Sequence, residues 1–94
     1  MKNFLCFTTV CGSRREAEFG LIKHIRGVVG QYYSIYVTDV VYTDTGETAE
    51  DARFGLFAAN DRVTYRGKTY WFNDLDRLCM AVENENNLAA LESL

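Results

Sequence analysis

The first third of the chain has a pattern that predicts a strand followed by a helix. Residues 3–10 (NFLCFTTV) are rich in aromatic and β-branched side chains and apolar nearly throughout, which is typical of a strand covered on both faces. Ser13 and Glu16 then match the S-x-x-E capping box, and apolar residues follow at helical spacing. We therefore predict a central strand over residues 3–10 and a helix over residues 14–26.

The middle of the chain predicts a second strand and a second helix. Residues 32–42 (YYSIYVTDVVY) are dense in β-branched and aromatic side chains, so they are expected to form a strand. With a helix between them, the first two strands should be parallel and joined by a right-handed crossover. After the loop TDTGE, Ala52, Leu56 and Ala59 share one face of a helix. A strand across residues 53–59 (RFGLFAA) is the alternative.

The last third predicts a hairpin and a final helix. Residues 62–72 (RVTYRGKTYWF) contain two short strand-like segments around Arg66-Gly67, where glycine supplies the positive φ of a tight turn. Asn73 then caps an amphipathic helix. The apolar face of this helix consists of Leu75, Leu78, Cys79 and Val82.

The size and composition fit one globular domain. The 94 residues suffice for a single core, so residues 1–94 are treated as one domain with the order β-α-β-α-β-β-α. The chain is 48% hydrophobic and 14% aromatic, which is enough apolar surface to support folding. A net charge of -3 argues against nucleic-acid binding through a bulk positive field, although it leaves room for a local basic patch.

The cysteine content and hydropathy indicate a cytoplasmic protein. Three cysteines are an odd number, and no signal-peptide pattern precedes them, so a secreted disulfide framework is not expected. No apolar run approaches the roughly 18 residues of a membrane span. We therefore expect a reducing compartment and no membrane partner.

Cys11 is the strongest candidate for chemistry. It lies between the first predicted strand and the predicted helix start, with Arg14 and Arg15 close behind. Helix amides, the helix dipole and two arginines would all favour the nucleophilic thiolate. The alternative is that Cys11 is a small turn residue. Cys6 and Cys79 are expected to pack in the core, and no cysteine or histidine spacing indicates a metal site.

The element order and two local patterns resemble the glutaredoxins. The segment VCGSRREAE places Cys11 at the nucleophile position, with CGSR where that family has C-x-x-C or C-G-x-S. The segment YRGKTYWFNDL has Gly67-Lys68 at the turn and Asn73-Asp74-Leu75 near the family's acidic pair. The resemblance implies a thioredoxin-like α/β fold, which is a mixed four-stranded sheet with helices on both faces.

The resemblance also implies an activity. It would be a thiol-disulfide oxidoreductase of the single-cysteine type, in which Cys11 attacks glutathione mixed disulfides. Arg14 would stabilise the thiolate, and Asp74 would lie near the glutathione amine. Glutathione would be a co-substrate rather than a bound cofactor, and the partner would be glutathione or a protein thiol. From the net charge of the chain, we expect no nucleic-acid partner.

Departures from the family pattern favour a second interpretation. The chain contains no proline, whereas the family has a cis-proline beside the active thiol. Tyr70 and Trp71 stand where the family's glycine pair leaves room for glutathione. The alternative is therefore a redox-inactive module that binds a protein partner through Tyr70 and Trp71, such as a small inhibitor or adaptor encoded by a virus or mobile element.

Overall fold

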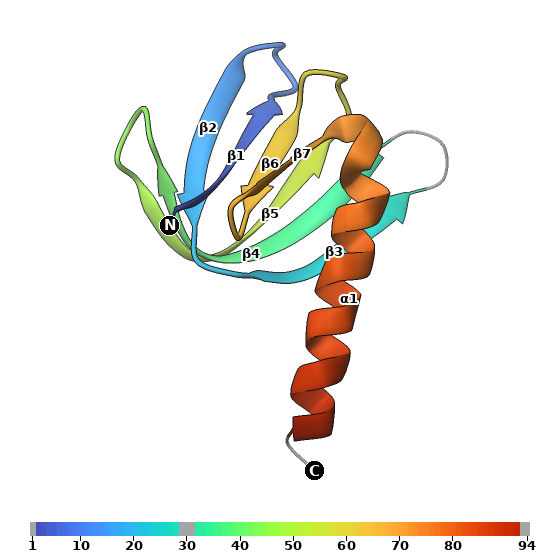
Figure 1. The fold of residues 1–94 in the computed structure, drawn as a ribbon. Helices are drawn as coiled ribbons and strands as arrows, with labels where there is room; N and C mark the ends of the chain where they lie inside the picture. The colour runs from blue at the N-terminus through green and yellow to red at the C-terminus, as the bar shows by residue number, and fades with distance from the viewer. Residues whose placement is uncertain (1, 29–31, 93–94) are drawn as a thin grey trace.

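The computed structural model describes residues 2–28 and 32–92, which form seven strands, a short 3-10 helix and one long α-helix (Figure 1). The strands are β1 (Asn3–Thr8), β2 (Arg14–Phe19), β3 (Ile22–Val28), β4 (Tyr32–Tyr42), β5 (Thr48–Leu56), β6 (Arg62–Tyr65) and β7 (Lys68–Trp71). The helices are η1 (Phe72–Asp74) and α1 (Leu75–Glu92).

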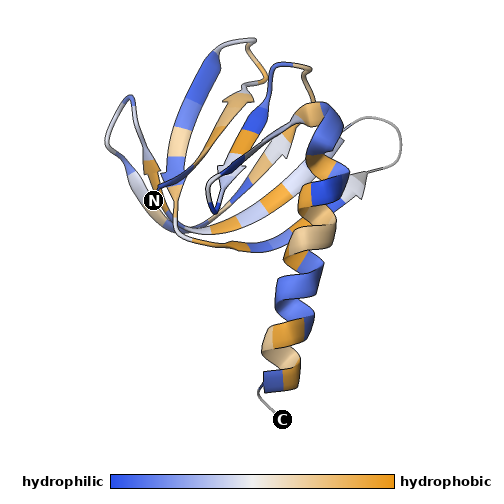
Figure 2. Cartoon of the chain, in the orientation of Figure 1, coloured by the Kyte–Doolittle hydropathy of each residue, from blue (hydrophilic) through white to orange (hydrophobic). Residues whose placement is uncertain are grey.

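The strands form one antiparallel sheet that curls into a half-barrel. Its strand order is β3-β4-β2-β1-β6-β7, and β5 pairs with the other edge of β4. The predicted thioredoxin-like α/β fold is therefore wrong: the described chain is mostly sheet, the sheet is not mixed, and its one long helix lies at the C-terminal end. Apolar and polar bands alternate along the strands (Figure 2), as expected for a sheet with one face on the core.

The predicted helix over residues 14–26 is replaced by β2 and β3. Ala17 and Phe19 are buried while Glu16 and Arg14 are exposed, so this segment follows the two-residue period of a strand. Strand β1 pairs with β2 along its whole length, and the tight turn between them uses Gly12 at φ 85°. This long-range pairing outweighed the local capping pattern.

The second predicted helix is also a strand. Residues Thr48–Leu56 form β5, which pairs with β4 along nearly all of its length. Phe54 and Leu56 are buried and Gly55 between them is exposed, which is strand alternation. The alternative strand over residues 53–59 is thus correct in type, but the strand begins earlier and ends earlier.

Three local predictions are confirmed. The strand over residues 32–42 has the same bounds as β4. The Arg66-Gly67 hairpin is present, with φ of 51° and 84° at its two turn residues, as a type I′ turn requires. The final helix is present as α1 and buries Leu75, Leu78 and Val82, although Asn73 lies within η1 rather than capping α1.

A bend at Gly20 produces the curl of the sheet. Strand β2 pairs with the end of β4, and β3 pairs with its beginning, so the two strands run along the same edge of β4. At the bend, the Gly20 N–H donates to the Thr38 carbonyl at 2.7 Å, and the Thr38 N–H donates to the Leu21 carbonyl at 2.9 Å. A Cβ at Gly20 would lie 2.9 Å from Thr38 Oγ1, so a larger residue would displace the Thr38 side chain, which accepts a hydrogen bond from the Leu21 N–H at 3.0 Å.

Helix α1 covers the side of the half-barrel that the bend leaves open. It packs against β3 and β7, and its Leu75, Leu78 and Val82 join the core. Farther along, the helix projects past the sheet (Figure 1), and Leu88 and Leu91 are exposed. No helix in the described part of the chain combines the length and apolar character needed to cross a membrane.

Substitution on the two halves of α1 should have very different effects. Leu78→Ala should lower the free energy of unfolding by about 2–5 kcal/mol, because it leaves a cavity at a fully buried position. Leu88→Ala is the matched control on the projecting half and should change it by less than about 0.5 kcal/mol. Urea unfolding followed by circular dichroism measures both, and equal effects would contradict the packing of α1.

Candidate functional site

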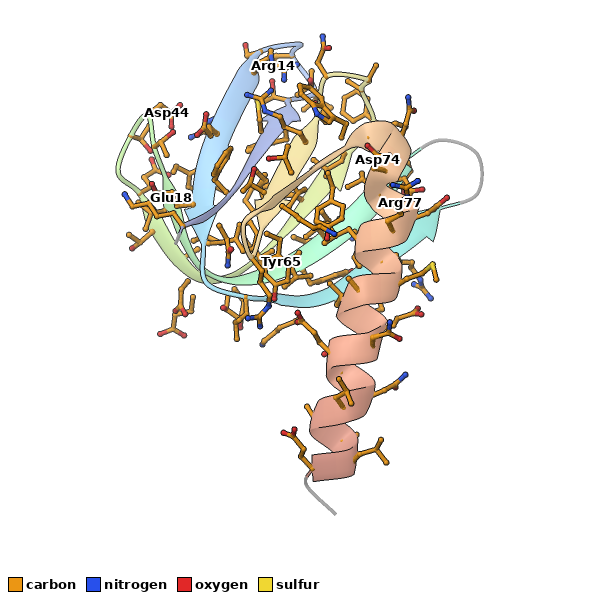
Figure 3. All side chains as sticks on the ribbon, in the orientation of Figure 1. Arg14, Glu18, Asp44, Tyr65, Asp74 and Arg77 are labelled. Atoms are coloured by element: carbon orange, nitrogen blue, oxygen red, sulfur yellow. The ribbon has the colours of Figure 1, made fainter. Side chains whose placement is uncertain are left out.

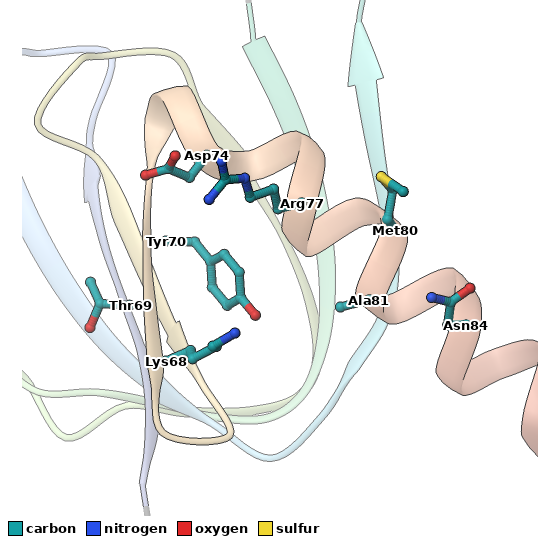
Figure 4. A pocket seen from close by; sticks show the side chains of 8 residues that line it. All are labelled: Lys68, Thr69, Tyr70, Asp74, Arg77, Met80, Ala81 and Asn84. Carbon is teal, nitrogen blue, oxygen red and sulfur yellow. The ribbon is translucent and has the colours of Figure 1, made fainter.

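A groove of about 410 Å³ lies between β7 and α1 (Figure 4). In Figure 4 the Tyr70 ring points from β7 toward the helix, and Asp74 and Arg77 lie next to each other where the chain enters α1. The groove is lined by Lys68, Thr69 and Tyr70 from β7, Asp74 from η1, and Arg77, Met80, Ala81 and Asn84 from α1. It therefore has one strand wall and one helix wall.

The strand wall is a free sheet edge. Strand β7 ends the strand order and pairs only with β6 in the described structure. The Phe72 N–H donates to the Asp61 carbonyl at 3.0 Å, and this bond determines which residues of β7 hydrogen-bond to β6. By antiparallel alternation, Tyr70 then bonds to β6, whereas the N–H and C=O groups of Thr69 and Trp71 turn toward the free edge.

Asp61 anchors the hairpin that carries this edge. It is fully buried, and one carboxylate oxygen accepts a hydrogen bond from Thr8 Oγ1 at 2.8 Å. The other accepts the N–H groups of Phe57 and Ala58 at 3.0 and 3.1 Å. Because a buried carboxylate requires such donors, these bonds hold the start of β6 in place, and with it the Phe72 bond that closes the ladder.

Two polar contacts fix the position of the helix wall. The Tyr33 hydroxyl donates to the Asp76 carboxylate in the first turn of α1, and the Tyr33 ring packs edge-on against Phe72. The hydrogen bond to Asp76, followed by burial, raises the pKa of Tyr33 to about 12. In the middle of the helix, Arg66 Nε pairs with Glu85 Oε1 at 2.7 Å. The helix is thus held near the start of the groove and beside the hairpin turn.

Of the four residues predicted to bind substrate, two lie at this groove. Tyr70 and Asp74 line it. Trp71 follows Tyr70 on the edge strand, and its ring, 45% exposed, lies on the opposite face under the guanidinium of Arg62 at 5.2 Å. The fourth, Arg14, lies elsewhere: Figure 3 shows it at the β1–β2 end of the sheet, apart from Asp74.

Cys11 lies in a different environment from the one predicted. It is exposed in the turn between β1 and β2, and a strand rather than a helix follows it, so no helix terminus is present to stabilise a thiolate. Arg14 donates to Cys6 Sγ at 3.1 Å and to a backbone carbonyl of the β5–β6 loop at 2.6 Å. Arg15 pairs with Asp44 at 2.9 Å and lowers the pKa of that carboxyl. Oxidoreductase activity at Cys11 stays a prediction, but the helix start on which that prediction was based is not present after Cys11.

The other two cysteines pack as predicted. Cys6 is buried, and Cys79 is partly buried against the core, where its thiol donates to the Ile25 carbonyl at 3.3 Å. Burial, with smaller contributions from Glu83 and Asp76, raises the pKa of Cys79. Residues 2–28 and 32–92 contain no cluster of three or more histidine, cysteine or acidic side chains that could hold a metal ion.

Sequence reasoning did not identify the helix wall of the groove. Arg77, Ala81 and Asn84 recur at intervals of four and three, so they form a stripe beside the buried face of α1. That stripe is readable from the sequence once the helix is placed. Its position opposite β7 is not, because it depends on how the helix packs across the sheet.

No protein-family model, curated protein or solved structure matches this chain.

The three thiols should react at different rates in the folded protein. Cys11 should be alkylated by iodoacetamide first at neutral pH because it is exposed. Cys6 should react only on unfolding, and the raised pKa of Cys79 should slow its reaction. Peptide mass spectrometry after timed alkylation measures each site, with Cys11→Ser as the control that removes the fast phase. A fast reaction at Cys6 would contradict its burial.

Proposed function

We propose that this chain is a peptide-binding module that takes an extended segment of a partner protein as an additional strand beside β7. The observation that carries the proposal is a free strand edge that lines a groove whose other wall is a helix. Edge strands offer unpaired N–H and C=O groups, and an extended peptide can satisfy them. The proposal develops the protein-binding interpretation of Tyr70 and Trp71.

Backbone hydrogen bonds would fix the peptide, and the groove would select its side chains. The peptide backbone would pair with the N–H and C=O groups of Thr69 and Trp71. Every second side chain of a strand points to the same side, about 6.6 Å apart, so alternate peptide side chains would enter the groove. There the Tyr70 ring, Met80 and Ala81 provide apolar contacts.

The charges around the groove favour an acidic segment. Lys68 and Arg77 contribute two positive side chains to the lining, whereas Asp74 contributes one negative one. Electrostatic complementarity of this kind acts chiefly on partner choice and association rate. We therefore expect a peptide that carries Asp or Glu beside apolar residues.

The short length of β7 limits both its affinity for a peptide and its tendency to aggregate through the free edge. Four residues can pair with only a few residues of a partner, which corresponds to a small interface and to transient binding. A short edge also reduces edge-to-edge aggregation. A reversible inhibitor or adaptor fits these features better than a permanent subunit.

We also place the module in the cytoplasm. All three cysteines are free, which suits a reducing compartment. Glutathione-dependent chemistry at Cys11 stays a separate prediction, and peptide binding does not depend on it.

A proline at position 71 tests strand addition directly. Trp71 has φ of -78°, which proline adopts, and its N–H faces the free edge, so Trp71→Pro should keep the β6–β7 ladder. Trp71→Ala is the matched control that removes the ring but keeps the N–H. With peptides selected from a random display library against the wild type, Trp71→Pro should bind about tenfold more weakly than Trp71→Ala, because a peptide carbonyl loses its donor.

Fluorescence anisotropy with the selected, labelled peptides measures these affinities, and thermal unfolding confirms that both variants fold. Equal binding by the proline and alanine variants would contradict pairing at this edge. Failure of the library to yield any peptide would contradict the proposed function as a whole.

A further inference from the structure

A second surface lies on the outer face of the sheet, away from the core and from the β7–α1 groove. It is formed where β3, β4 and β5 pair side by side. One cross-strand row consists of His24, Tyr36 and Arg53, and the next consists of Arg26, Ser34 and Gly55. We define the outer β4 face as His24, Arg26, Tyr32, Tyr36, Arg53 and Phe57.

The outer β4 face is locally basic although the chain is acidic overall. Lys23 and Asp51 border the face and neutralise each other at 3.1 Å. Arg26 and Arg53 are exposed, and neither forms an ion pair with any residue that the structure describes. Two guanidinium groups are therefore left to bind an anionic ligand.

The same face presents aromatic rings to solvent. Tyr32 is 42% exposed, Tyr36 is 38% exposed and Phe57 is 49% exposed. The His24 and Tyr36 rings pack together with centroids 5.7 Å apart. Aromatic side chains left uncovered beside unpaired arginines provide stacking surfaces and positive charge in one place.

An open space separates these groups along β5. Gly55 lies between Arg53 and Phe57, and a Cβ built on it would meet no atom within 4 Å. Phe57 is the first residue after β5. Residues four apart along an extended strand have Cα atoms about 13 Å apart, so this spacing would leave room for a planar group above Gly55. The space is accessible, because Gly55 itself is exposed.

We infer that the outer β4 face binds single-stranded nucleic acid. Bases would stack on Phe57 and Tyr36, and phosphates would contact Arg26 and Arg53. A single strand fits better than a duplex, because a duplex keeps its base faces within its own stack. It also fits better than an acidic peptide, which would use the arginines but leave the rings and the flat space over Gly55 unused. The negative net charge of the whole chain does not oppose this binding, since the contact is made by a local basic surface.

Fluorescence anisotropy at low salt tests this inference with labelled 12-nucleotide oligothymidylate and oligouridylate. At least one of the two should bind, and a 12-base-pair duplex should bind more weakly. With about two phosphates contacted, the logarithm of the affinity should fall with the logarithm of salt concentration with a slope near -1.4. The better ligand of the two then identifies DNA or RNA as the natural class.

Variants locate the contact. Phe57→Ala and Arg53→Ala should each weaken binding about tenfold, since each removes a stacking or charge contact. Phe57→Tyr keeps a ring and should retain binding, and Lys2→Ala removes a positive charge outside the face and should bind like the wild type. Thermal unfolding checks that each variant folds.

Four outcomes would overturn the inference. They are no binding of either oligonucleotide, equal binding of the duplex, displacement by polyglutamate as effective as displacement by unlabelled oligonucleotide, or an equal loss in Phe57→Tyr and Phe57→Ala. None of them bears on peptide binding at β7, so the two sites are tested independently.

Discussion

The packing of α1 across the open side of the curled sheet is the interaction on which the rest of the structure depends. The bend at Gly20 carries β3 away from β1 and leaves the core uncovered between β3 and β7. Leu75, Leu78 and Val82 fill that opening and are fully buried. Burial of three such side chains contributes several kcal/mol, on the order of 2 kcal/mol each, to the stability of a domain this small.

The same helix that completes the core also creates the candidate site. Burial of its apolar face stabilises the fold. Asp76 and Glu85 then hold the helix at one position, through contacts with Tyr33 and Arg66. The helix passes beside β7 without forming backbone hydrogen bonds to it in the described structure, so the edge of β7 stays unpaired. The helix then forms the second wall of the groove. A groove with a free backbone edge is therefore a direct consequence of closing a half-barrel with a helix.

The sequence predicted those elements whose signals are local. The Arg66-Gly67 turn, the strand over residues 32–42 and the apolar face of the last helix all depend on neighbouring residues, and all three are present. The helix over residues 14–26 was wrong because its capping box and apolar spacing compete with strand alternation, and the choice between them is made by pairing with β1. No local pattern contains that information.

The residues of the candidate site also separate into those that sequence reasoning identified and those that it did not. Tyr70 and Asp74 were chosen through the glutaredoxin resemblance, whose implied fold is wrong. Both still line the groove, since they lie in the hairpin and at the start of the final helix, two elements that were predicted in the right places. Cys11 and Arg14 were assigned roles that required a helix after the turn, and that helix is a strand. Arg77 and Asn84 were missed because their importance arises from tertiary packing alone.

Amide hydrogen exchange across β7 is the most direct test of the open edge. In the free protein, the Thr69 and Trp71 N–H groups should exchange at least about tenfold faster than that of Tyr70, because they face away from β6. A bound peptide should then protect both. Slow exchange at Thr69 with fast exchange at Tyr70 would contradict this account, since it would turn the opposite backbone groups toward the groove.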